Sequence, residues 1–371
     1  MGVHPFLLVI AAAGLDRLVG DPRWAPHPVV LMGWLIERLR RLSEAWAGDH
    51  PRRLLLAGGL ITLVLVGGSA LAGWLLERLA LAGGWGETMP GPVGGQGLLG
   101  AVIAPLPLLV ALASALAGRS LEQAVRAVLA AVAVADLPLA RQQLSWIVGR
   151  DTDGLDGPEL LRAAAETASE NAVDGLFAPL FWMLLGAALW SAGLTAAPGP
   201  LALAWAFKAA STLDSMLGYR RGRLLWLGRA GARLDDRLVW LPCRLVALTL
   251  PLAAGREPRA CRATLRAALR DGAPDPSPNA GVSQACYAHV VGVQLGGPNR
   301  YAGRVRVKPL LAAGSPPPDG ASVARMLSLS LRLELIWLAA AALGGWALGA
   351  ALPALAEVVA GRLVATIATA Q

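Results

Sequence analysis

The sequence predicts an all-α, polytopic integral membrane protein with large polar loops and interfacial helices on its cytoplasmic side. Of its 371 residues, 55% are hydrophobic and only 16% are charged, and the mean hydropathy is +0.53. This composition is too apolar for an ordinary soluble protein and too charged for an uninterrupted bundle of spans. Tryptophan, with 13 residues, dominates the aromatics, which suits the role of indole at headgroup depth. We expect residues 1–371 to form one membrane-embedded domain.

Four apolar runs are long enough to cross the ~30 Å hydrocarbon core at about 1.5 Å per residue. They lie near residues 54–76, 97–117, 176–194 and 333–353. Four weaker candidates are short or interrupted by charge or proline, so they are either re-entrant or interfacial. These are 3–15, 200–210, 238–254 and 355–369.

Arginine is distributed unevenly among the polar segments. Four segments are rich in it, namely 16–53, 118–175, 211–237 and 255–331. The segments 79–96 and 191–199 contain no lysine or arginine. By the positive-inside rule the arginine-rich segments are cytoplasmic, which predicts a multi-pass protein of the cell (inner) membrane with its functional loops inside. The segment 238–254 should then not cross fully, as Pro242 and Arg244 within it suggest.

Composition and motifs argue against several classes of function. The basic residues are nearly all arginine, and no basic run interleaved with aromatics points to a nucleic-acid partner. The three cysteines have no CxxC spacing and are expected to be reduced bystanders. Residues 95–100 read GQGLLG, but no strand precedes them, and there is no Walker loop. Any nucleotide must therefore be held in another way.

An acidic stripe directly precedes the third apolar run. Glu166, Glu170 and Asp174 follow one another at four-residue spacing, which places them on one face of a helix. Like charges at this spacing repel by about 0.2–0.5 kcal/mol per pair, so the stripe favours a compensating cation. Arginine or Mg²⁺ can supply it, while an exposed helix face is the plain alternative.

A second polar face ends the following apolar segment. Lys208, Ser211, Asp214 and Ser215 recur at three- to four-residue intervals. Burying a lysine and an acid there is expensive without a partner, although a snorkelling lysine remains an equal alternative.

A third pattern combines arginines and acids. Arg229, Arg233 and Arg237 share a helix face, with Asp235 and Asp236 beside them. They form either a self-neutralised helix or a site for phosphate oxygens and a cation. The stretches DPSPNAGVSQACYAH and LGGPNRYAGR, rich in Pro, Asn and Gly, are expected to be loops whose backbone amides can wrap an anion.

These segments together resemble a known family. LDRLVGDPRWAPHPVVLMGWLI, ARQQLSWIVGRDT, ETASENAVDGLFAPLFW, KAASTLDSMLGY, GARLDDRLVWLPCRL and SPNAGVSQA followed by LGGPNRY are similar, in order, to the motifs of the CobD/CbiB family of cobalamin-biosynthesis membrane proteins. The resemblance extends from about residue 14 to 305. It implies an ATP-dependent, Mg²⁺-requiring amide ligase that joins adenosylcobyric acid to (R)-1-aminopropan-2-ol or its O-phosphate.

The resemblance and the polar patterns together give the candidate site residues. Catalytic candidates are Lys208, Asp214, Glu170 and Asp174. Metal candidates are Glu166, Glu170, Asp174, Asp235 and Asp236. Candidates for substrate or phosphate contacts are Arg150, Asp151, Asn171, Ser211, Arg229, Arg233, Arg237, Asn279, Asn299 and Arg300. The general base is left open between His27, His289 and other groups.

Expected partners are the two substrates, ATP, the lipid bilayer and other late enzymes of the same pathway. Two other classes of function stay open. A non-catalytic membrane scaffold for corrinoid enzymes needs many of the same residues. A transporter is less favoured, because most charges lie at the ends of the apolar runs and in loops rather than at their centres.

Overall fold

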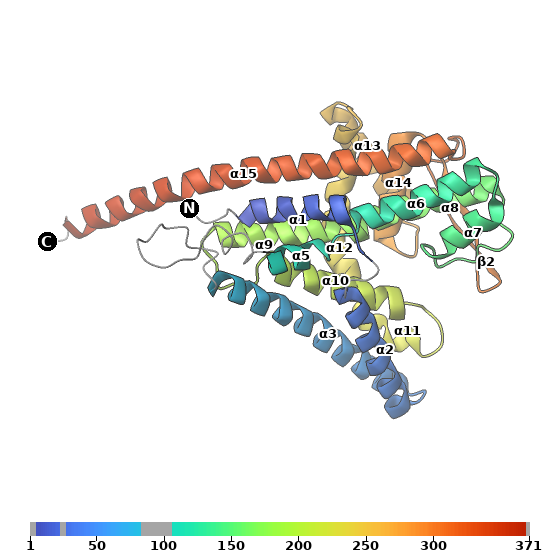
Figure 1. The fold of residues 1–371 in the computed structure, drawn as a ribbon, viewed down its shortest axis with the longest axis horizontal. Coiled ribbons are helices and arrows are strands. Elements are labelled where there is room, and N and C mark those ends of the chain that lie inside the picture. The colour runs from blue at the N-terminus through green and yellow to red at the C-terminus, as the bar shows by residue number, and fades with distance from the viewer. Residues whose placement is uncertain (1–4, 23–26, 83–105, 369–371) are drawn as a thin grey trace.

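The computed structural model describes residues 5–22, 27–82 and 106–368 and is built largely from helices (Figure 1). Among the described residues, three helical segments are long and apolar enough to cross a membrane: Pro51–Ala80, Gly157–Ser191 and Gly320–Gly345. They coincide with the spans expected near 54–76 and 176–194 and with most of the one near 333–353. The all-α, polytopic membrane fold expected from the sequence is confirmed.

The span expected at 97–117 is described only in part, since residues 97–105 lie outside the described residues. Its remainder forms the short helix α5 (Leu106–Ala113), which bends by 41° into α6 (Gly118–Ala133). Together the two helices pass the same test of length and hydropathy, as one broken span.

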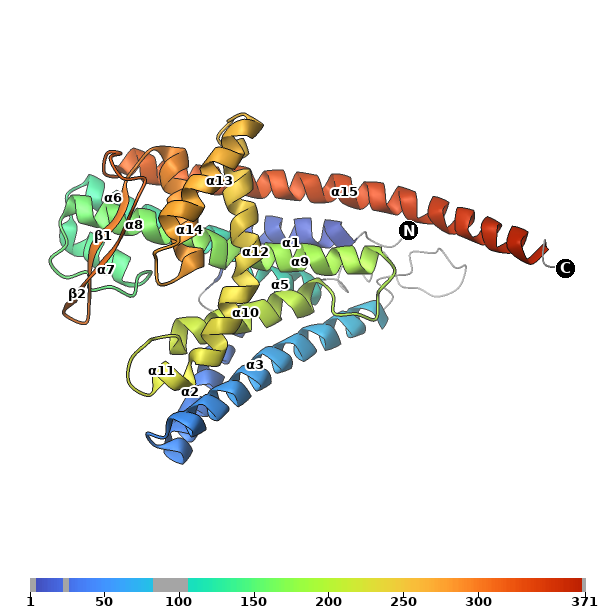
Figure 2. The same ribbon diagram turned by 180° about the vertical axis from the view of Figure 1, so that it is seen from behind.

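The apolar helices pack along one another. Helix α9 (Ala178–Ser191) contacts α1 (Pro5–Val19), α10 (Pro200–Leu217) and α15 (Gly320–Ala368), and α10 also packs on α3 (Pro51–Ala80). Figure 2 shows the start of α1 and the α9–α10 connection at one end of this bundle, and α6, α8 and α14 at the other. The polar segments and the apolar bundle are thus separated along its length.

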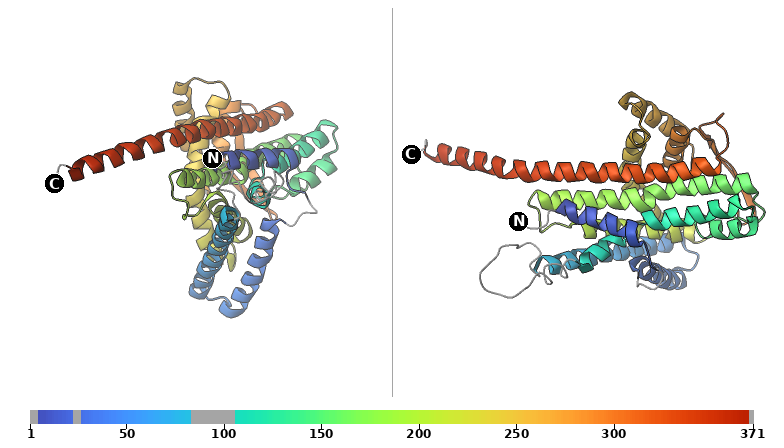
Figure 3. Two further views of the ribbon diagram at one scale, coloured as in Figure 1. Left: turned by 60° about the vertical axis from the view of Figure 1, so that its left-hand side comes forward. Right: turned by 45° about the horizontal axis from the view of Figure 1, so that its top comes forward.

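Helix α12 (Arg229–Ala253) runs across the bundle instead of along it (Figures 2 and 3). It includes the expected non-crossing segment 238–254, continues through Pro242 and Pro251, and is not among the candidate spans of the described residues. The remaining helices of the described residues are α2 (Pro28–Ala47), α7 (Leu137–Ser145), α11 (Leu224–Leu227) and α13 (Pro258–Gly272).

Helix α8 (Gly157–Ala172) joins α9 through a π-helical turn at Val173–Phe177. A capping box between Asp156 and Glu159 starts the helix. The whole segment has 35 residues and, at about 1.5 Å per residue, is roughly 52 Å long, whereas the hydrocarbon core is ~30 Å thick. About 20 Å of α8 therefore extends beyond the bilayer if α9 spans it. The π-turn frees the carbonyl of Gly175, which accepts the Ala117 N–H (2.9 Å) where α5 bends into α6.

The N-terminal motif ties three helices together. Asp16 of α1 accepts hydrogen bonds from the N–H groups of Gly118 (3.0 Å) and Arg119 (3.3 Å) at the start of α6. Arg17 pairs with Glu334 of α15 (2.5 Å) and with Glu122 of α6 (3.2 Å). Asp16 and Arg17 therefore serve to hold α1 against α6 and α15.

The expectation that DPSPNAGVSQACYAH is a loop is wrong, because most of it forms helix α14 (Pro278–Val291). Pro278 occupies the first turn, where its missing N–H costs nothing. Gly281 faces Gly272 of α13 so closely that a Cβ there would clash with the neighbouring backbone. Proline and glycine here serve helix initiation and helix packing, not a turn.

The second expected loop, LGGPNRYAGR, is instead the first half of an antiparallel β-hairpin of β1 (Leu295–Tyr301) and β2 (Arg304–Leu311). The pairing shifts register at Gly296 and Gly297, which both have positive φ, so the glycines form a bulge in the strand. The hairpin is a local departure from the helical fold at the polar end of the molecule.

Candidate functional site

A cavity of about 690 Å³ opens at the polar end and unites segments that are distant in the sequence. Its walls come from the loop after α7, one face of α8 and the π-turn, the end of α10, and the hairpin. The side chains and glycines lining it are Trp146, Ile147, Val148, Gly149, Arg150, Thr167, Glu170, Asn171, Asp174, Asp214, Ser215, Gly218, Tyr219, Tyr301 and Lys308. Five of the predicted site residues line it: Arg150, Glu170, Asn171, Asp174 and Asp214.

One face of α8 supplies the polar floor of the cavity. Glu170 accepts a hydrogen bond from Gln284 Nε2 of α14 (2.7 Å). Asn171 Nδ2 donates to Thr167 Oγ1 (2.9 Å), and that hydroxyl donates to the carbonyl of Ile147 (2.8 Å). The bond from Thr167 to Ile147 holds the loop after α7 against α8, and the bond from Gln284 holds α14 against α8. Both neighbours of α8 in the cavity wall are thus fixed to it.

Glu166 does not line the cavity and binds the hairpin instead. It forms ion pairs with Arg150 and with Arg162 (3.1 Å), and accepts the N–H of Gly296 (2.9 Å). Both arginines also donate to Asn299 Oδ1, at 2.8 and 3.0 Å. Glu166 and Asn299 thus dock the hairpin onto α8, and both oxygens of Glu166 already have partners.

Asp151 holds the tip of the hairpin. Its carboxylate accepts the N–H groups of Ala302 (3.0 Å) and Gly303 (2.7 Å), and its own N–H donates to the carbonyl of Arg300 (2.8 Å). The side chain of Arg300 lines a separate polar hollow of about 210 Å³. Asp151 therefore positions the turn.

A cluster of carboxylates borders the cavity. Asp174 lies within electrostatic reach of Asp235, Glu170 and Asp214. Burial, reinforced by the charges of Asp214 and Asp236, raises the pKa of Asp235 to about 8. Asp235 Oδ1 is buried without a hydrogen-bond partner among the described residues. Burial, with Asp236 and Glu170, likewise raises the pKa of Asp214 to about 6. The cluster therefore gathers more carboxyl groups than its described neighbours can keep ionised without a further cation.

The chain's two lysines lie next to these acids. Lys308 of β2 lines the cavity and pairs with Asp275 (3.2 Å). Burial alone would lower its pKa, but the charges of Glu170 and Asp275 overcome that effect and raise the pKa. Lys208 does not line the cavity and lies within electrostatic reach of Asp21 and Asp174. Each lysine can balance carboxylates from one side of the cluster.

The residues fit a magnesium ion that is bound mainly by water and phosphate oxygens and only partly by the protein. Within the described ranges, no three His, Cys, Asp or Glu side chains converge as an all-protein metal cage. Mg²⁺ usually takes only one or two carboxylates and completes its shell with water and phosphate oxygens. Asp235, with its unpartnered oxygen, and Asp174, which lies within electrostatic reach of it, offer such a pair, whereas Glu166 is engaged elsewhere.

The other predicted residues lie outside this cavity. Arg229 and Arg233 line a separate hollow of about 360 Å³, and Arg237 lines neither. Asn279 donates through Nδ2 to the carbonyl of Asp236 (2.8 Å) and accepts from Arg244, so it braces α12. The carbonyl of Ser211 accepts a hydrogen bond from the Ser215 hydroxyl (2.9 Å).

Neither histidine considered as a base lines the cavity. His27 Nδ1 accepts the N–H of Val29 (3.2 Å) and caps α2, and its Nε2 faces Asp21 (3.1 Å). His289 Nε2 faces Asp271 (2.7 Å) near the end of α14.

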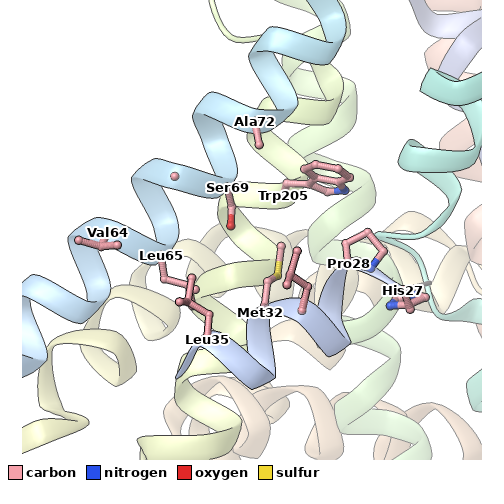
Figure 4. A pocket seen from close by; sticks show the side chains of 11 residues that line it. His27, Pro28, Met32, Leu35, Val64, Leu65, Ser69, Ala72 and Trp205 are labelled. Atoms are coloured by element: carbon pink, nitrogen blue, oxygen red, sulfur yellow. The ribbon is translucent and has the colours of Figure 1, made fainter. Parts of the chain in front are cut away.

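A different hollow, of about 540 Å³, is apolar (Figure 4). Figure 4 shows Met32 and Leu35 of α2, Leu65 of α3 and Trp205 of α10 around it. It has no carboxylate in its lining, and α3 is one of the candidate spans. The polar cavity is therefore the candidate active site.

Several site residues were missed in the sequence. Lys308 carried a usable signal, because lysine occurs only twice in this arginine-rich chain. Arg162 lies four residues before Glu166, the usual spacing of a helical ion pair. Tyr301, which lines the cavity, and Gln284, which donates to Glu170, lie in stretches whose composition predicts loops, so their positions could not be foreseen.

Comparison with known proteins identifies relatives over nearly the whole chain. A family model described as CobD/Cbib protein matches residues 9–330. The cobalamin biosynthesis protein CobD of Synechocystis is 40% identical over 338 residues, covering 90% of this chain and 91% of the relative. The cobalamin biosynthesis protein CbiB of Salmonella typhimurium is 36% identical over 330 residues, covering 88% and 91%. No solved structure matches significantly. The chain belongs to the CobD/CbiB family.

Proposed function

We propose that this chain acts in cobalamin biosynthesis as adenosylcobinamide-phosphate synthase. The reaction joins the free propionate of adenosylcobyric acid to the amine of (R)-1-aminopropan-2-ol or its O-phosphate, with ATP as co-substrate and Mg²⁺ as the metal ion. Relatives of 36–40% identity are named as cobalamin biosynthesis proteins. The observation that carries the proposal is that residues from four motif segments line one cavity with uncompensated carboxylates and a lysine.

The chemistry needs an activated acyl group, because a carboxylate is a poor acyl donor. A propionate oxygen attacks the terminal phosphorus of ATP, and ADP leaves. The amine nitrogen then attacks the acyl carbon of the resulting acyl phosphate, and phosphate leaves. Lys308 and Arg150, which both line the cavity, stabilise the negative charge that develops on the phosphate and acyl oxygens.

Asp174 and Asp235 would hold Mg²⁺, with Glu170, Asp214 and Asp236 beside them. When bound, the ion neutralises phosphate charge and acts as a Lewis acid. Lys208 lies within electrostatic reach of Asp174 and can balance its negative charge. Glu166, Asp151, Asn299 and Asn279 position the hairpin and α12 around the cavity.

The amine must lose a proton before or as it attacks. Asp214, with a pKa of about 6, is near the value at which a base works best at neutral pH. It lines the cavity at the end of α10. We assign the base to Asp214, because neither His27 nor His289 lines the cavity.

The cavity should face the cytoplasm of a cell whose inner membrane holds the apolar helices. Arginine-rich segments surround it, and the positive-inside rule favours that orientation. Hydrophilic ATP and an amphiphilic corrinoid can both reach a site there.

Amide formation by purified protein tests this function. Protein in detergent, incubated with adenosylcobyric acid, ATP, Mg²⁺ and each amine in turn, is expected to yield the amide by mass spectrometry. ATP consumption should depend on both substrates. Absence of the amide with either amine would leave the scaffold function as the better account.

A further inference from the structure

The hollow beside the start of α12 differs in charge from the main cavity. It has a volume of about 360 Å³ and lies among the end of α10, α11 and the first turns of α12. Its polar lining includes Arg220, Arg229, Arg233 and Asp236. Gly218 and Tyr219 line both hollows, so the two meet at the C-terminal end of α10.

The arginines of this hollow are not consumed by ion pairs. Among the described residues, Arg220, Arg229 and Arg233 form no salt bridge, and Asp236 is the one carboxylate in the lining. By contrast, Arg150 and Arg162 at the hairpin are both paired with Glu166. Three guanidinium groups around one acid leave a net positive hollow with free hydrogen-bond donors, which suits a ligand with several phosphate oxygens.

We infer that this hollow binds the phosphate chain of a nucleoside triphosphate; the inference rests on the proposed function and assigns its nucleotide site. Trp226 and Tyr219 also line it; the Trp226 ring offers a face for stacking a nucleobase, while the Arg221 guanidinium already lies over the Tyr219 ring. The shared wall then directs the terminal phosphate toward the main cavity.

The arrangement accounts for transfer between the two hollows. Asp236 lines the arginine-rich hollow, its neighbour Asp235 belongs to the carboxylate cluster, and Asp214 lines the main cavity. A substrate carboxylate in the main cavity attacks the terminal phosphorus, the bond from that phosphorus to the bridging oxygen breaks, and the nucleoside diphosphate keeps the electron pair. No Walker loop is needed.

A lipid headgroup offers the same phosphate chemistry, because the hollow lies close to the apolar bundle. The experiment therefore uses protein in nanodiscs of either neutral phosphatidylcholine or anionic phosphatidylglycerol. Arg229→Gln and Arg233→Gln remove a guanidinium from the hollow. Arg237→Gln is the matched control, since Arg237 is exposed on the same helix and lines neither hollow.

Two readouts are measured: photolabelling by 8-azido-ATP, and the KM values for ATP and the amine. We expect each hollow variant to raise the KM for ATP about tenfold or more, as loss of a charged hydrogen bond implies. The KM for the amine, the melting temperature and the Arg237→Gln variant should stay at wild-type values, in both kinds of nanodisc.

Equal labelling and equal KM for ATP in all variants of an active enzyme would overturn the nucleotide site alone. An effect seen only in phosphatidylglycerol discs would overturn it in favour of a lipid headgroup. A wild-type protein that forms no amide would instead overturn the proposed function, and the nucleotide donor with it.

Discussion

At the scale of single residues, the acidic stripe of α8 divides into two tasks. Glu166 docks the hairpin through two arginines and a backbone amide, whereas Glu170 and Asp174 line the cavity. The spacing predicted that all three acids share a face and need cations. The spacing could not predict which cation pairs with each acid, because Arg150 and Lys308 belong to segments that only tertiary folding brings close to α8.

Neutralising the cavity acids should affect chemistry and not folding. Asp174→Asn and Glu170→Gln keep nearly the same volume but remove a charge from a crowded carboxylate cluster, so abundance and detergent stability should be normal or slightly higher. Amide formation should fall at least ~100-fold, the scale of losing one electrostatic stabiliser. Glu257→Gln, an exposed acid with no side-chain capping bond, is the control. Near-full activity in both cavity variants would remove these acids from the mechanism.

The raised pKa of Asp235 predicts how stability depends on pH. Its pKa is about 8 in the folded protein against an ordinary value of 3.8, so the folded state binds more protons than the unfolded state between these values. The contribution of Asp235 to stability is complete below about pH 4 and is lost as pH rises through 8. Without divalent cations, the melting temperature should therefore fall from pH 5 to 8.5.

In the Asp235→Asn variant the melting temperature should depend less on pH, and at pH 8.5 it should be higher than that of the wild type. Thermal unfolding followed by tryptophan fluorescence measures both. Parallel profiles for the two proteins would show that Asp235 is not a buried acid held near its neutral form.

Lys308 should be required for amide formation, because it lines the cavity. Lys308→Gln leaves Glu170 and Asp275 without their cation and removes a charge from beside the reacting groups, so amide formation should drop about 100-fold or more. Lys308→Arg should restore only part of the rate, since a planar guanidinium differs in shape from an ammonium. Wild-type turnover by Lys308→Gln would exclude Lys308 from the site.

At the scale of elements, the long apolar helices followed from composition, but α14 and the hairpin did not. Pro278 and Gly281 look like turn residues until their positions are known: one starts a helix and the other lies at a helix crossing. Gly296 and Gly297 likewise form a bulge within a strand. Proline and glycine occur in turns, at helix starts, at helix crossings and in strand bulges. Only long-range packing decides which of these a given residue adopts.

The glycine bulge gives a test of what the hairpin does. Gly296 has a φ of +85°, and a Cβ there would collide with the carbonyl of Pro309. Gly296→Ala should therefore loosen the hairpin and speed hydrogen exchange of the backbone N–H groups in residues 295–311. Formation of the amide product should also fall, because Tyr301 and Lys308 leave the cavity wall. Gly303→Asn is the control, since asparagine tolerates positive φ and no atom lies within 4 Å of the added Cβ. Unchanged exchange in Gly296→Ala would contradict the docking role.

At the scale of the whole molecule, the polar segments gather at one end of the apolar bundle (Figure 2). Cysteines introduced at Asp153, Arg223 and Ser277 should therefore all resist an impermeant thiol reagent in sealed cells. Thr195→Cys, in the connection at the opposite end, should react. Background labelling should be low, because the described native cysteines Cys243, Cys261 and Cys286 are buried. Labelling of one of the three from outside would divide the proposed site between two compartments.

The central claim is that the cavity activates a carboxylate with ATP and passes it to an amine, and isotope transfer tests it most directly. Adenosylcobyric acid carrying ¹⁸O in its free propionate is incubated with purified protein, ATP, Mg²⁺ and aminopropanol phosphate. We predict one ¹⁸O in inorganic phosphate for each amide formed, with both products reduced at least ~100-fold in Asp174→Asn. Amide formed without ¹⁸O in phosphate would contradict the acyl phosphate route, and no amide at all would contradict the enzyme.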